Sequence, residues 1–300
     1  MRLSVLRRAL PLLVCAALAG SAGHTETAPP AAEDGKTPSV QRDISECRKS
    51  FPDVVQNPSS AGGVAVLSSW NGFFSRRHVL CFYGSLEHVQ AAEMARELGK
   101  LETVDTLVVR STGGAVTSWL TLAEALAGKV EVVAVDDICV SSCANYAFFL
   151  GDRKVVPENG LVVWHGGPYA RDPAEEDASA PFASPEERDD YNRLVERTAA
   201  LYRKLGVSTR ILRDTSELTL GPEEREFLAR QGEETDEPIS ISGFAIDPAA
   251  LSYCYGVTGL EDMWHPGFFQ AVFDIGRRRS SDLQVLMRPG SIQDPPCGQP

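Results

Sequence analysis

The chain has 300 residues, of which 43% are hydrophobic, and this is enough for one large domain or two small ones. Its formal net charge is −12. A chain this acidic is poorly suited to bind nucleic acid or an anionic membrane surface, so we expect neither kind of partner.

Residues 1–22 are typical of a secretory signal peptide. Arginines near the start supply positive charge, an apolar run follows at 9–18, and small residues precede a cleavage point after Ala22. The apolar run is short for a bilayer span. We therefore predict export, a periplasmic or secreted location, and no membrane span after cleavage. An uncleaved membrane anchor is the alternative interpretation.

The cysteines agree with export. Of seven cysteines, Cys15 lies in the signal peptide, and the even number that remains permits disulfides whose pairing the sequence does not choose. Cys139 and Cys143 bracket two serines. A metal site there would need two further ligands, which no nearby His or Cys pair supplies. We predict disulfides, no metal and no cofactor.

Regular elements begin well after the N-terminus. Residues 23–42 are rich in Ala, Pro, Thr and charge without an apolar period, which predicts a flexible leader. Beyond it, apolar β-type runs alternate with helically periodic segments closed by glycine. The predicted strands are 78–83, 106–110, 130–135, 154–156 and 161–164, and the predicted helices are 85–99 and 115–126.

Strands that alternate with helices predict a mainly parallel α/β sheet. In such sheets functional groups gather at the carboxyl ends of the strands. Gly113 and Gly114 directly follow one strand, Ser141 and Ser142 lie at a turn after another, and His165 ends a later one. These groups therefore fall where this architecture places a site.

The composition changes after residue 167. Residues 168–181 are acidic and rich in Ala and Pro, as in a loop, and a strong helix start at Ser184 follows. We predict one domain over 43–275, a helical insertion at 168–240 that forms a lid or partner surface, and a flexible tail at 276–300.

The candidate residues supply the parts of a serine hydrolase. Hydrolysis needs a hydroxyl, here Ser141 or Ser142, and a base, here His165. It also needs backbone N–H donors for the oxyanion, here Gly114 and the residue after the nucleophile. Each part alone has a simpler explanation, namely a helix-entry turn, an N-cap or a structural histidine. Their order favours chemistry, because the serine follows Gly114 by 27 residues and His165 follows Ser141 by 24.

The segment 79–165 resembles the Clp protease/crotonase superfamily, and in particular its exported branch with signal peptide peptidase A and Clp-like periplasmic proteins. Residues 111–114, Ser-Thr-Gly-Gly, stand where that family has Ser-Pro-Gly-Gly. Residues 135–141 match its turn Val-Asp-Gly-x-Ala-Ala-Ser, with Asp137 in place of glycine. Residues 139–143 fit the Cys-x-Ser-x-Cys form of the exported proteins, and Arg153 matches a basic residue that precedes the histidine strand.

The resemblance implies a spiral of ββα units and a serine-type peptidase acting on a peptide or protein substrate. It implies Ser141 as nucleophile and His165 as base, with oxyanion donors at Gly114 and Ser142. A one-residue shift makes Ser142 the alternative nucleophile. Asp247 stands where a third member of a triad is expected. The family also forms rings and other oligomers, so the resemblance implies a homo-oligomer.

Two other functions fit the same sequence. A crotonase-like acyl-thioester enzyme would keep the oxyanion donors, but export separates it from coenzyme A, which is a cytoplasmic cofactor. A non-catalytic binding or assembly protein would retain the fold without the chemistry, because one fold hosts many functions.

Overall fold

The computed structural model describes residues 37–57, 60, 62–71, 75–86, 91–158, 160–169, 184–216, 222–235, 241–264, 269–279 and 285–288. Residues 36–300 form one compact unit, to which all of these residues belong. The predicted signal peptide and nearly all of the predicted loop 168–181 lie outside the described residues.

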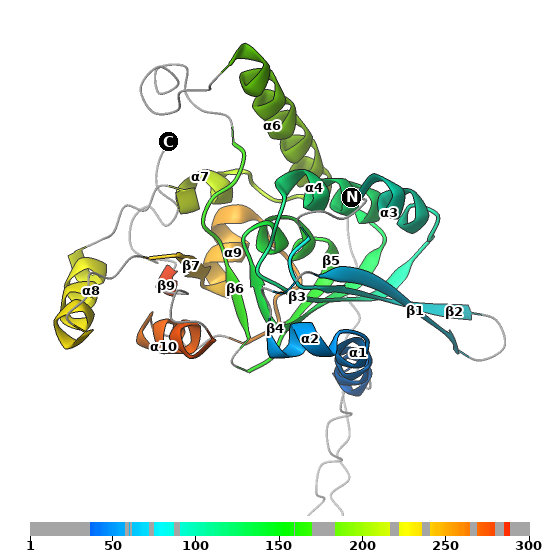
Figure 1. The fold of residues 1–300 in the computed structure, drawn as a ribbon, viewed down its shortest axis with the longest axis horizontal. Helices are drawn as coiled ribbons and strands as arrows, with labels where there is room; N and C mark the ends of the chain where they lie inside the picture. Colours follow the sequence, from blue (N-terminus) through cyan, green and yellow to red (C-terminus); the bar gives the residue numbers. More distant parts are fainter. Residues whose placement is uncertain are drawn as a thin grey trace, which may run out of the picture. The chain divides into compact units, whose positions relative to one another are not determined.

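A mainly parallel sheet of seven strands forms the centre of this unit, so the predicted α/β class is confirmed (Figure 1). The strand order is β1-β2-β3-β4-β5-β8, and β6 pairs with β4 beyond the end of β5. Only the pair β1–β2 within this sheet is antiparallel. The strands are β1 (Gly63–Asn71), β2 (Ser75–Tyr83), β3 (Val104–Ser111), β4 (Val130–Val140), β5 (Gly151–Val156), β6 (Leu161–Val163) and β8 (Asp262–Met263).

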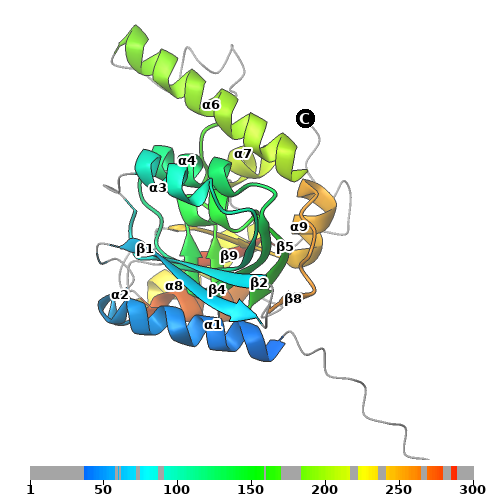
Figure 2. The same cartoon turned by 90° about the vertical axis from the view of Figure 1, so that its right-hand side faces the viewer.

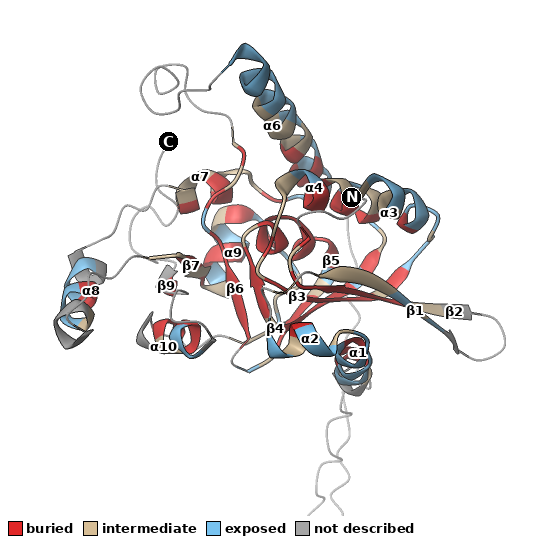
Figure 3. Ribbon diagram, in the orientation of Figure 1, coloured by how far each residue is buried: buried red, intermediate tan, exposed pale blue. Residues whose placement is uncertain are grey.

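Helices cover both faces of the sheet (Figures 1 and 2). One face carries α3 (Ala91–Leu98), α4 (Val116–Leu126) and the π-helical turn η1 (Cys143–Ala147), and the other carries α1 (Thr37–Ser50) and α2 (Pro52–Gln56). The central strands β3 and β4 are therefore buried on both sides (Figure 3). A strand buried on both faces has a nearly continuous apolar sequence, which is why these two were recognisable from sequence.

Helix α1 begins inside the range that we predicted to be a flexible leader. Val40, Ile44 and Cys47 recur at helical spacing and are buried against the sheet. A disulfide between Cys47 and Cys81 joins the helix to β2. The leader was predicted too long because this apolar stripe spans few residues and lies beside a charge-rich segment.

The C-terminal part contains the predicted helix after Ser184 and differs from the prediction in its tail. Helix α6 begins after Ser184, whose hydroxyl accepts the Glu187 N–H at 3.2 Å. The predicted flexible tail, however, contains an ordered strand, β9, that pairs in parallel with β7. The elements are α6 (Pro185–Leu205), α7 (Arg210–Ser216), α8 (Pro222–Thr235), β7 (Gly243–Ile246), α9 (Pro248–Tyr255), α10 (Phe269–Arg279) and β9 (Val285–Arg288).

Disulfides agree with an extracytoplasmic protein. Besides Cys47–Cys81, a second bond joins Cys139 to Cys143, and Cys254 is disulfide-bonded as well. Across the described ranges, no helix has the length and apolar character that a membrane crossing requires.

Candidate functional site

The strand β4 is distorted just before the two serines. Val109 of β3 pairs with Val135, but Ser111 pairs with Cys139, so β4 bulges between these pairs. Asp137 and Ser141 are the two non-glycine residues in the described chain with positive φ, at 79° and 61°. Such a conformation is uncommon outside glycine and clusters at functional sites. Asp tolerates it, which explains how Asp137 replaces the glycine of the expected motif.

The backbone of Ser141 is fixed while its side chain remains accessible. Its N–H donates to the Val163 carbonyl of β6, and its carbonyl accepts the Asn145 N–H, both at 2.9 Å. The residue is partly exposed. Its hydroxyl makes no hydrogen bond to any residue of the described ranges, so it is available to an incoming group.

Ser142 occupies a different environment. It is 2% exposed, and its hydroxyl donates to the Gly114 carbonyl at 3.0 Å. The two serines thus differ in their hydrogen bonds. Ser142 binds the glycine turn through its hydroxyl, whereas the Ser141 hydroxyl bonds to none of the described residues. This arrangement favours Ser141 over Ser142 as the reactive residue.

The glycine turn packs directly on Ser141. A Cβ on Gly113 would lie 2.8 Å from the Ser141 Cβ and 3.2 Å from its Oγ, at a φ of 106°. The Gly113 N–H donates to the Ser111 Oγ at 2.9 Å, and its carbonyl accepts the Leu86 N–H at 3.1 Å. The N–H groups of Gly114 and Ser142 are not bonded to any described residue. Both therefore remain available as donors, one on the residue after Ser141 and the other on the residue after Gly113, which packs on Ser141.

His165 directly follows the strand that neighbours the serine turn. Val140 of β4 pairs with Val163 of β6, so His165 lies just beyond the strand that pairs with the end of β4 before the serine turn. The residue is exposed. Within the described part of the chain its ring makes neither a hydrogen bond nor an ion pair. The fold thus brings together the predicted Gly114, Ser141 and Ser142, and it places His165 just beyond the end of the neighbouring strand β6.

The turn after His165 is held from two sides. The Gly166 N–H donates to Thr215 Oγ1 at 3.0 Å, and its carbonyl accepts Asn145 Nδ2 at 2.7 Å. Sequence reasoning missed both partners, because both contacts are distant in sequence. The one available signal was a polar residue, Asn145, inside the apolar segment that follows the serines.

The structure does not bring Asp247 to His165. Its carboxylate caps α9, accepting the N–H groups of Ala249 at 2.7 Å and Ala250 at 3.3 Å. An antiparallel bridge joins Trp164 to Phe244, so the chain leaves Phe244 toward Asp247 in the direction away from His165. The predicted catalytic role of Asp247 stays a prediction, and the observed role is an N-cap.

A different acid lies on the element that reaches the histidine turn. Asp214 immediately precedes Thr215, the residue that binds the Gly166 N–H. Its carboxylate accepts the Tyr255 hydroxyl at 3.2 Å and the Arg213 Nε at 3.3 Å. Sequence reasoning placed this residue within the helical insertion predicted at 168–240 but did not locate it near the turn after His165.

A buried ionic cluster supports the bulge from the other face of the sheet. Asp136 is 1% exposed and accepts Arg48 Nη2 of α1 at 2.5 Å and the Tyr83 hydroxyl at 2.6 Å. Asp137 pairs with Arg110 at 3.2 Å. Burial, followed by the charge of Asp136, raises the pKa of Tyr83 far above its ordinary value. Tyr83 therefore stays protonated and donates to Asp136.

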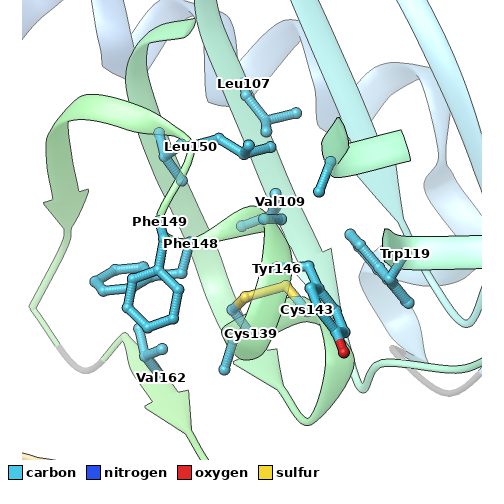
Figure 4. Packing of buried hydrophobic residues seen from close by; sticks show 14 of the residues in the cluster. Leu107, Val109, Trp119, Cys139, Cys143, Tyr146, Phe148, Phe149, Leu150 and Val162 are labelled. Carbon is cyan, nitrogen blue, oxygen red and sulfur yellow. A yellow bond between two sulfur atoms is a disulfide. The ribbon is translucent and has the colours of Figure 1, made fainter. Parts of the chain in front are cut away.

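The Cys139–Cys143 disulfide closes the serine turn from inside the core. Both sulfurs belong to fully buried residues, and the bond lies beside Tyr146 (Figure 4). It joins β4 to η1 across Ser141 and Ser142. The turn thus rests on a covalent brace, a packed core and the ionic cluster of Asp136.

No protein-family model matches this chain, and no curated protein does either. Among the residues described, no group of three or more His, Cys, Asp or Glu side chains is arranged to hold a metal ion.

Proposed function

We propose that this protein is an exported serine hydrolase that cleaves peptides or proteins, with Ser141 as nucleophile and His165 as base. The observation that carries the proposal is the Ser141 turn. A hydroxyl that bonds to none of the described residues sits on a backbone of positive φ, packed against the Gly113–Gly114 turn. Strand β6, which ends shortly before His165, pairs with the last residues of β4 before this turn.

The chemistry follows from these positions. Ser141 Oγ attacks the carbonyl carbon of the scissile bond while a ring nitrogen of His165 takes the hydroxyl proton. The carbonyl oxygen becomes an oxyanion, which the N–H groups of Gly114 and Ser142 bind. The tetrahedral intermediate collapses, the leaving group takes the proton from His165, and water then hydrolyses the acyl-enzyme by the same steps.

The finer fold that we propose is a Clp/crotonase-like spiral. Its support is the order in which glycine turn, serine turn and histidine follow the neighbouring parallel strands β3, β4 and β6. Export is supported by the signal-like N-terminus and by disulfides in the mature chain.

A fluorophosphonate probe, which reacts with activated serines, tests the proposal. We expect the purified protein to be labelled at Ser141, Ser141→Ala to lose labelling completely, and His165→Gln to slow labelling at least about 100-fold. Peptide mass spectrometry identifies the labelled residue. Unfolding in denaturant checks that each variant is folded.

Matched substitutions control this experiment. Ser252 is an exposed serine of α9, and His78 lies on β2 away from the site. Ser252→Ala and His78→Gln should label at the wild-type rate. Labelling that persists in Ser141→Ala would refute the nucleophile, and a label found on Ser142 would move it by one residue.

We place the third group of the site at Asp214 and not at Asp247. The support is position, because α7 reaches the His165 turn through Thr215, whereas Asp247 caps α9. We expect Asp214→Asn to slow probe labelling about tenfold or more. Asp247→Asn should change neither labelling nor stability, since Asn caps helices about as well as Asp. If labelling is instead slow in Asp247→Asn and normal in Asp214→Asn, Asp247 is the third group of the site.

A non-catalytic binding protein is the second candidate. The observation that favours it is the exposed His165 ring, which no carboxylate of the described chain contacts. A serine without an oriented base is a weak nucleophile. The absence of labelling in a folded wild-type protein would therefore decide for binding.

A further inference from the structure

Asn145 joins three elements at the candidate site. It lies in η1, four residues after Ser141, and is 2% exposed. Its N–H donates to the Ser141 carbonyl, and its Nδ2 donates to the Gly166 carbonyl at 2.7 Å. Its own carbonyl accepts the Tyr202 hydroxyl of α6 at 2.8 Å. One residue thus connects the serine turn to the histidine turn.

Thr215 completes the hold on Gly166 from the opposite side. Its hydroxyl donates to the Ile211 carbonyl at 2.6 Å, which leaves a lone pair to accept the Gly166 N–H at 3.0 Å. Gly166 has a φ of 95°, and a Cβ there would lie 2.0 Å from Ser216 Oγ. Both backbone polar groups of Gly166 are therefore fixed in a turn that is closed to a side chain.

The Asn145 amide carries a cost that a purely structural residue would avoid. Its Oδ1 is buried and has no hydrogen-bond partner among the described residues. An unsatisfied buried acceptor destabilises a protein, whereas an apolar side chain of similar shape does not incur that penalty. The benefit of the amide at this position is the bond to Gly166.

We propose that Asn145 and Thr215 are positioning residues that hold His165 against Ser141 through the Gly166 peptide. We call this pair the Gly166 clamp. The inference rests on the proposed serine hydrolase function. Neither residue touches the reacting atoms, and each acts by fixing the direction in which the chain leaves His165. Geometry of this kind matters because a displacement of about 1 Å can slow a reaction about 100-fold.

Isosteric substitutions separate positioning from folding. Asn145→Leu and Thr215→Val each remove one side of the clamp while keeping the number and branching of the side-chain heavy atoms. We expect each to slow maximal probe labelling between about 10-fold and 100-fold, with less than about a threefold change in the half-saturating probe concentration. Thr215→Ser keeps the hydroxyl and should restore at least half of the wild-type rate. Asn145→Leu should shift Tm by less than about 3 °C, because it also removes the unsatisfied Oδ1.

A measurement that does not depend on enzyme activity distinguishes a failure of the clamp proposal from a failure of the proposed function. The Gly166 amide should exchange with deuterium at least about tenfold faster in Thr215→Val than in the wild type or Thr215→Ser, as measured by NMR. If Thr215→Val shows this faster exchange but the probe does not label the wild type, the clamp is a structural device, and its catalytic role is refuted together with the proposed function. A labelled wild type with unchanged rates in Asn145→Leu and Thr215→Val would refute the clamp alone. If Asn145→Leu does not fold, the Thr215→Val and Thr215→Ser pair decides.

Discussion

Gly113→Ala is expected to reduce probe labelling of Ser141 by more than about 100-fold. A Cβ at this position would lie 2.8 Å from the Ser141 Cβ and 2.9 Å from the Val140 carbonyl oxygen. The φ of 106° is also outside the range that alanine readily adopts. Ser141 or the glycine turn must therefore move, which displaces the nucleophile from the N–H donors. The measurement is the labelling rate, with intact protein mass as the readout.

Gly206→Ala is the matched control. Gly206 also has a positive φ, 71°, but a Cβ there would meet nothing within 4 Å. This substitution should cost about 1 kcal/mol of stability through backbone strain and leave labelling unchanged. Equal labelling by the two variants would show that the glycine turn does not contribute to the site.

Asp136→Ala is expected to lower the free energy of unfolding by about 2 to 4 kcal/mol. The substitution removes the acceptor of the Arg48 guanidinium and of the buried Tyr83 hydroxyl. Buried donors that lose their acceptor pay the full cost of desolvation. Arg48 is about half exposed, at 51%, and can regain water, which keeps the effect below the largest values known for buried pairs. Denaturant titration at neutral pH measures the change.

The exposed pair of Arg153 and Asp262 provides the comparison. Its atoms approach to 2.6 Å, but Asp262 is 42% exposed, so Asp262→Ala should cost less than about 1 kcal/mol. A loss of stability in Asp136→Ala no larger than that of Asp262→Ala would contradict the role given to the buried cluster.

The sequence predicted those parts of the fold in which burial or capping produces a recognisable pattern of neighbouring residues. The strands around Val108 and Val133 were recognisable because they are apolar on both faces. The helix after Ser184 was recognisable from its N-cap, proline and acidic first turn. Because these strands are parallel, the ends that carry Gly114, Ser141 and His165 were expected at one edge of the sheet.

Contacts between distant segments were not predictable in this way. Helix α1 begins within the predicted leader, and β9 lies in the predicted tail, where it pairs with β7. The bond between Thr215 and Gly166 spans 49 residues, and no local pattern indicates it. Asp247 was chosen as an acid by its place in the chain, whereas local chemistry, an Asp before a proline at a helix start, indicated a cap.

The two resolved disulfides close loops of very different length, so they restrict the unfolded chain to different extents. Cys47–Cys81 spans 34 residues and Cys139–Cys143 only 4. The chain-entropy model gives about 4 kcal/mol for the longer loop and about 2 kcal/mol for the shorter one. The long loop mainly restricts the unfolded ensemble, which favours folding of the whole unit. The short one restricts little of that ensemble, and its main effect is to limit the fluctuations of the native serine turn.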